Sequence, residues 1–139
     1  MAEFSDNFLR LHKGEESIRD LSIKAIESNA DLVYHVQMIE KVMDILYTFI
    51  MCHIHENEDE LALQCLGIRL FNSSASALKL SLSGYYQNSA QLLRDLLETT
   101  FLLDYFQTDK ALIGVWRACK ENERSKEFAP AKIRLCKQC

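Results

Sequence analysis

Arg94 and Glu98 are the residues of this sequence whose types and spacing point most directly to chemistry. They lie four residues apart in an apolar stretch, so a helix places both side chains on one face. A guanidinium can hold a phosphate through two hydrogen bonds, and a carboxylate can exchange a proton. The pair is our catalytic or recognition candidate. The alternative is a structural ion pair, which contributes roughly 0.3–0.5 kcal/mol when exposed. If the pair were buried, removing one partner would cost ~3–5 kcal/mol.

Cysteines and histidines are the candidate metal ligands. Cys136 and Cys139 form a C-x-x-C, which is half of a zinc site, and either Cys119 or the Cys52–His53 cluster could complement it. The run CHIHE at residues 52–56 also contains metal-competent types, but a His-x-His in a helix points its rings in different directions. Reduced thiols and a polar helix end are the favoured interpretations. We therefore predict no cofactor.

The charge is distributed unevenly along the chain. The formal net charge is −4, which divides into −9 over residues 1–109 and +5 over residues 110–139. A basic segment can bind RNA through its phosphates, and Lys132, Arg134 and Lys137 are the candidates for that contact. We favour the alternative, in which the basic end docks on the acidic body of the chain or on a neighbouring subunit.

Length and composition indicate one soluble helical domain. The 139 residues are 48% apolar and 26% charged, with one proline and four glycines, so few residues would break a helix. We predict a single domain over residues 1–139, in which 124–139 is a basic, partly irregular segment. The sequence contains no apolar run of about 18–20 residues and begins with no signal-like segment, which predicts a cytoplasmic protein without a membrane span.

Apolar periodicity predicts the elements that position Arg94 and Glu98. The fold class predicted is all-α, an antiparallel bundle of four to five helices. Its spine is predicted at Asp31–Ile54, Glu58–Ser83 and Tyr85–Phe106. Around it we expect a short segment ending at Gly14, a helix at Glu15–Ser28, a helix at Asp109–Glu123 capped by Thr108, and a short basic helix after Pro130.

The apolar surface of these helices exceeds what so small a chain needs for its own core. On the third spine helix, one stripe carries Tyr86, Ala90, Leu93, Leu97 and Phe101. On the first, the apolar stripe is wide enough to contact two neighbours. We therefore predict a homodimer.

Residues 84–134, well under half of the chain, resemble a family of uncharacterised bacterial all-helical proteins. The resemblance is carried by GYYQNSAQLLRDLLE at residues 84–98, by Trp116, and by FAPAKIR at residues 128–134. Members of that family have a Gly-Tyr that opens a helix containing R-S/D-L-L-E, followed later by F-x-P-x-x-I/V-R. They have no assigned reaction.

That family is similar in build to HEPN domains, the helical bundles of toxin–antitoxin and phage-defence systems. The resemblance implies a ribonuclease only where an Arg is followed within a few residues by a His. In this chain the histidines, at positions 12, 35, 53 and 55, all precede Arg94. The sequence therefore favours a non-enzymatic interaction or regulatory protein. A divergent RNA-binding or ribonuclease site around Arg94 and a small zinc protein are the alternatives, and a further protein partner is also expected.

Overall fold

The structure is entirely helical over the part of the chain that it describes. The computed structural model describes residues 5–136, and side chains as far as residue 133. Seven helices and no strand occur in this range. They are α1 (Asp6–Glu27), α2 (Ala30–Cys52), α3 (Glu58–Leu82), α4 (Tyr86–Phe106), α5 (Ala111–Ala118), α6 (Glu121–Glu127) and α7 (Pro130–Cys136). The prediction of an all-α bundle is confirmed.

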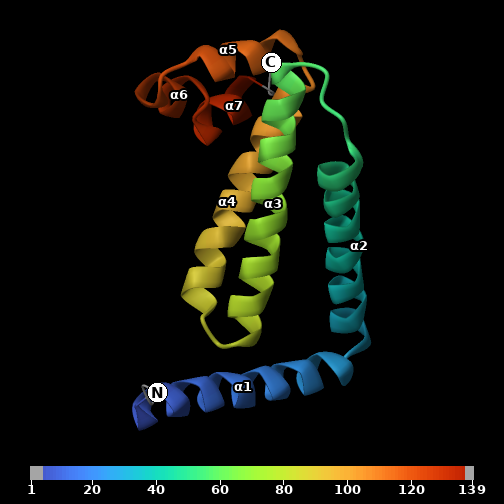
Figure 1. The fold of residues 1–139 in the computed structure, drawn as a ribbon, viewed down its shortest axis with the longest axis vertical. Helices are drawn as coiled ribbons and strands as arrows, with labels where there is room; N and C mark the ends of the chain where they lie inside the picture. The colour runs from blue at the N-terminus through green and yellow to red at the C-terminus, as the bar shows by residue number, and fades with distance from the viewer. Residues whose placement is uncertain (1–4, 137–139) are drawn as a thin grey trace, which may run out of the picture.

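Three long helices form a layer that is closed off at both ends. α3 and α4 run antiparallel as a hairpin, and α2 lies along the other side of α3 (Figure 1). α1 crosses the layer beside the α3–α4 turn, while α5, α6 and α7 gather at the opposite end. The three predicted spine helices are therefore α2, α3 and α4, with bounds that differ by at most two residues.

Asparagine caps and one glycine set the corners of the layer. The side chain of Asn29 accepts hydrogen bonds from the N–H groups of Asp31 and Leu32, and Asn57 does the same at the start of α3. Gly84 ends the α3 helix with a φ of +88°, a left-handed conformation that side chains disfavour. The three corners lie within two residues of the predicted ends of the spine helices.

Two predicted boundaries are wrong. Gly14 does not end a segment but lies within α1, on an open part of the surface where nothing would meet a Cβ. An exposed glycine weakens a helix by about 1 kcal/mol without ending it.

The helix predicted at Asp109–Glu123 divides at Cys119, which is extended, into α5 and α6. The Thr108 hydroxyl donates back to the Tyr105 carbonyl of α4, and the Asp109 side chain accepts from Ala111 N–H instead.

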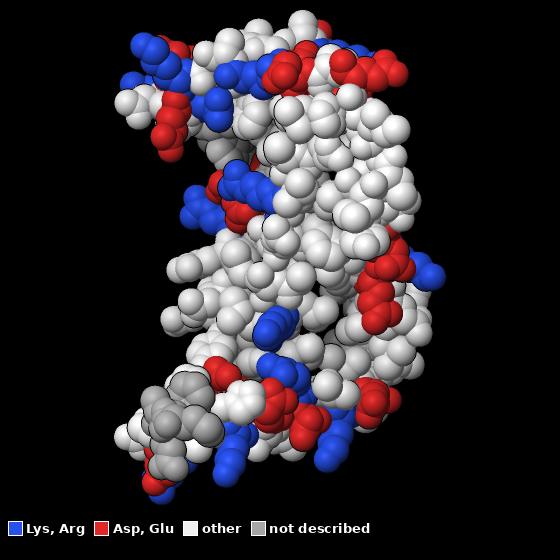
Figure 2. Space-filling model, viewed as in Figure 1, with Lys and Arg blue, Asp and Glu red and all other residues white. Residues whose placement is uncertain are grey.

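The core lies at one end of the α3–α4 hairpin. Leu66, Phe106 and Ile113 are buried there, and Trp116 and Phe128 pack around them. No residue of α1 or α2 is buried. On the face drawn in Figure 2, charged side chains gather mainly at the two ends, so most of the surface between them is uncharged. No helix among the described residues is both long and apolar enough to cross a membrane.

Candidate functional site

Arg94 and Glu98 form an exposed ion pair on α4. Arg94 Nε donates to Glu98 Oε1 at 2.8 Å. The Arg94 side chain is 82% exposed and that of Glu98 36%. An i,i+4 pair in this setting contributes roughly 0.3–0.5 kcal/mol, because water screens it. Of the two possibilities raised by the sequence, the exposed pair is therefore the one observed.

The pair borders a shallow cavity of about 620 Å³ between α4 and the start of α7. Ala90, Leu93 and Leu97 form the α4 wall, and Pro130 lies opposite. Leu93 and Leu97 are 51% and 57% exposed, and Tyr86 on the same stripe is 65% exposed. The residues beside Arg94 and Glu98 are thus apolar side chains in contact with solvent, which suits an interaction surface.

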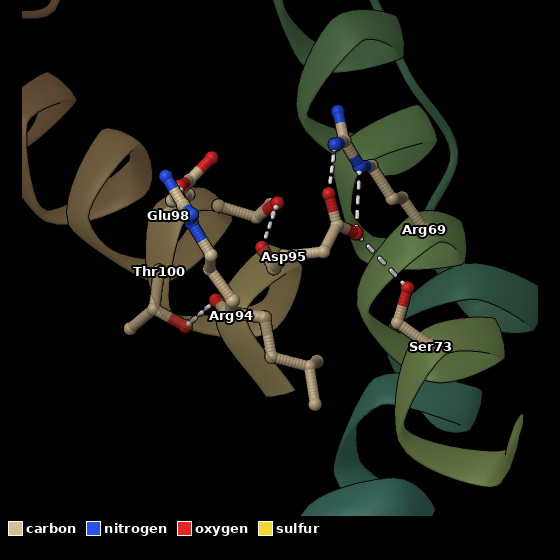
Figure 3. A network of polar contacts seen from close by, with 8 residues as sticks. Arg69, Ser73, Arg94, Asp95, Glu98 and Thr100 are labelled. Carbon is tan, nitrogen blue, oxygen red and sulfur yellow. Dashed lines mark hydrogen bonds and ion pairs between the residues drawn. The ribbon is translucent and has the colours of Figure 1, made fainter. Parts of the chain in front are cut away.

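A second polar cluster joins α3 to α4, and it was missed from the sequence. Arg69 donates to both carboxylate oxygens of Asp95, with Nε to Oδ2 at 3.1 Å. Ser73 Oγ donates to the same Oδ2 at 3.1 Å. Figure 3 shows Asp95 pointing from α4 toward α3, whereas Arg94 and Glu98 lie on another side of α4. This cluster ties the hairpin together.

The Arg69–Asp95 contact changes how both groups titrate. The Arg69 guanidinium lowers the pKa of the Asp95 carboxyl, with a smaller contribution from the Ser73 hydroxyl, although partial burial opposes the shift. The hydrogen bond to Asp95 in turn raises the pKa of Arg69. Both groups are therefore charged at neutral pH, and the cluster is a fixed bridge between helices.

Hairpin geometry would have predicted this cluster. Ser73 and Asp95 each lie eleven residues from Gly84 along the sequence, and positions equally distant from an antiparallel turn face each other. Nearer the turn, the Ser89 hydroxyl donates to the Ala77 carbonyl at 2.8 Å. Arg69 precedes Ser73 by one helical turn. The available signal was thus the register about Gly84.

A groove made of two separate cavities lies along one side of α3, between α2 and α4. Two cavities, of about 610 and 230 Å³, are lined by residues of all three helices. Six of their α3 residues alternate in four- and three-residue steps, so these six form a single helical stripe. That stripe, which we call the α3 groove floor, consists of Leu63, Gly67, Leu70, Ser74, Ala77 and Ser81.

The predicted nucleic-acid residues can be placed only in part. Lys132 forms an ion pair with Glu127. The Arg134 side chain and the whole of Lys137 lie outside the described residues. Farther up the basic segment, Arg117 donates to Asp59 at 2.6 Å and to Glu58 at 3.1 Å. The basic end therefore docks, at this point, on the acidic start of α3.

The described part of the chain has no group of three or more side chains that could hold a metal. Cys119 is a half-buried free thiol. The Cys136 side chain and Cys139 lie outside the described residues, so the proposed three-cysteine site is not tested.

In the CHIHE run, the His53 ring stacks on Phe49. His53 Nε2 also lies 3.6 Å from a Glu60 oxygen. The Glu60 carboxylate accepts the Glu56 N–H, which lowers its pKa.

Comparison with protein families, with curated proteins and with solved structures finds no match to this chain.

Proposed function

We propose that this protein is a non-enzymatic helical interaction module that acts as a homodimer. Its type is HEPN-like and bacterial, connected with toxin–antitoxin or phage-defence systems, as the resemblance at residues 84–134 implies. The proposal rests above all on the amount of apolar surface that the chain leaves exposed.

The exposed area is the observation that supports a partner. The chain exposes 10,496 Å². A compact folded monomer of 16.1 kDa exposes about 7,400 Å² by the usual scaling of surface with mass. Each subunit of a standard complex buries about 800 Å², and obligate dimers bury up to about 2,500 Å² per subunit. Even a third of the excess, about 1,000 Å², is enough for one such interface.

The exposed side chains are of the kind that interfaces bury. Fourteen of the large apolar residues that face solvent lie on α1 and α2. Monomeric soluble proteins rarely leave apolar patches of this extent uncovered. In contrast, the Arg94–Glu98 pair has no histidine beside it, and its arginine is already bonded to a carboxylate. These features favour interaction over catalysis.

Light scattering coupled to size-exclusion chromatography tests the proposal. The full chain at micromolar concentration should elute with twice the 16.1 kDa of one copy. A monomer that persists as the concentration is raised would refute the dimer. Dilution should shift the mass toward the monomer, because dimer formation follows mass action.

RNA binding is the second candidate, and the charge of +5 over residues 110–139 favours it. Against this candidate, four cations are already bonded to carboxylates. They are Arg69, Arg94, Arg117 and Lys132. A salt titration of RNA binding decides the matter, because phosphate contacts weaken steeply with salt. Absence of binding at low salt removes this candidate.

A further inference from the structure

The α3 groove has the lining of a helix-binding surface. Its floor includes Ser74 and Ser81, whose small side chains let another backbone approach closely. Ile39 of α2 and Leu93 of α4 form its walls at the end near the α3–α4 turn. That half of the groove has no charged residue in its lining. Charged groups line only the other end, around Asp59, Glu60 and Lys110.

One residue connects this groove with the exposed stripe of α4. Leu93 lines the groove and also lines the cavity on the far side of α4 that Arg94 and Glu98 border. The apolar surface therefore continues from the groove over α4, along Tyr86, Leu93 and Leu97. The stripe has the four- and three-residue spacing of a helix–helix seam.

We propose that α4 of a second copy lies in the α3 groove, with a two-fold axis near Leu93. This inference rests on the proposed homodimer and specifies its interface. A two-fold axis at this residue places each α4 stripe over the other copy's groove at the same time, which closes the assembly. The α3–α4 hairpins of the two copies then form a four-helix bundle.

The other helices are less suited to occupy the groove. α1 is held beside its own hairpin, because Arg19 donates to Ser83 at 3.0 Å and Ser22 donates to the Leu82 carbonyl at 3.0 Å. α2 of the same chain is one wall of the groove and so cannot also lie in it. The α4 stripe buries no charge when it enters, since the Arg94–Glu98 pair lies beside it and stays at the solvated rim.

A matched pair of substitutions tests the location. Leu93→Glu places a charge in the proposed seam. Ile68→Glu places the same charge on α3, at a residue that is 41% exposed and lines neither cavity. Loss of a central apolar contact typically weakens an interface by about 30-fold or more. We expect light scattering to show monomers for Leu93→Glu and dimers for Ile68→Glu, with unchanged helical circular dichroism.

Two further variants keep the test decisive if Leu93→Glu unfolds. Ser74→Phe fills the groove floor without changing any residue of the α4 stripe, and it should also give monomers. In a chain whose five cysteines are replaced by serine, Leu93→Cys should form a disulfide-linked dimer on oxidation, because the axis brings the two thiols together. Ile68→Cys should not.

The outcomes separate this inference from the proposal beneath it. A monomeric wild type refutes the homodimer, and the groove assignment with it. A dimeric wild type that persists in Leu93→Glu and Ser74→Phe, or that is disrupted only by Ile45→Glu on α2, overturns the groove assignment and leaves the homodimer in place.

Discussion

The α3–α4 hairpin and the α1–α2 arm (residues 6–52) are built on opposite principles. All buried side chains of the described residues lie at or beyond Leu66, in the hairpin or in the short helices that follow it. The arm has none, although α2 is the more apolar of its two helices. The hairpin therefore supplies its own core, whereas many apolar side chains of the arm face solvent.

Small polar residues explain the close packing of the hairpin. Ser73, Ser89 and Thr99 are buried between or within the helices, and each donates its hydroxyl to an oxygen of the hairpin. Satisfied hydroxyls of this size let two backbones approach without leaving an unpaired polar group. The arm touches the hairpin at fewer points, such as Phe49 against Gly67 and Ile18 beside Gly84. Apolar periodicity alone does not distinguish these two situations.

Phe106→Ala should have the largest effect on this contrast. Phe106 is 3% exposed and contacts the rings of Trp116 and Phe128, so its truncation should lower the free energy of unfolding by about 3–5 kcal/mol. Ile45→Ala in the arm removes a side chain that is 69% exposed, and it should change the free energy of unfolding by less than about 0.5 kcal/mol. Urea denaturation at one low protein concentration measures both.

Equal costs for these two substitutions would contradict the contrast. A large cost at Ile45 that grows with protein concentration would show that α2 is covered by a partner, because association stabilises the folded state by mass action.

Two glycines offer the next comparison, with opposite signs. Gly84→Ala forces a side chain into a positive φ, which costs about 1–2 kcal/mol. Its Cβ would also lie 3.4 Å from Ile18 Cγ2. Gly14→Ala in the arm meets nothing and should raise stability by about 1 kcal/mol, since alanine favours a helix. Thermal unfolding followed by circular dichroism should show the melting temperature falling in the first variant and rising in the second.

Asp95→Asn should show how far the polar bridge stabilises the hairpin, and at which pH. The folded-state pKa of Asp95 is lowered, so its ionised carboxylate stabilises the folded state above the unfolded pKa of about 3.9. This stabilisation disappears as the pH falls through the folded value. We expect a loss of about 1 kcal/mol at pH 7, because Arg69 is largely solvated.

The measurement is unfolding free energy from pH 7 downward, where the gap between wild type and Asp95→Asn should close. Arg69→Gln should cost a similar amount and add little in the double variant, since both changes remove the same contact. A gap that stays constant down to pH 2 would mean that the carboxylate charge is not what stabilises the bridge.

The sequence predicted the helices well because local rules determine them. Asn29, Asn57 and Gly84 act within one turn, and their positions bound α2, α3 and α4 to within two residues. The errors at Gly14 and Thr108 arose where two local signals competed. At Gly14, the continuous helix on either side outweighed the weak tendency of glycine to break a helix.

The candidate site was predicted less well because contacts between helices determine it. Arg94 and Glu98 were found since they share one helix, but their exposure depends on which side of α4 faces α3. Asp95, their neighbour in sequence, bonds Arg69, which lies 26 residues earlier. Register about Gly84 places Ser73 opposite Asp95, and Arg69 lies one helical turn from Ser73, so predicting the pairing needs both rules. The Arg134, Lys137 and Cys139 predictions concern side chains outside the described part of the chain.

Arg94→Ala should have the smallest effect, and it tests the role of the Arg94–Glu98 pair. If the pair lies at the rim without a binding role, the free energy of unfolding falls by roughly 0.3–0.5 kcal/mol at low salt. This difference vanishes at 1 M salt, where charges are screened within about 3 Å. Dimer mass should stay unchanged. Glu98→Ala should behave alike, because the ion pair is what each removes. A loss above about 2 kcal/mol in either variant would mean that a partner surface buries the pair, since only a desolvated ion pair has that much to lose.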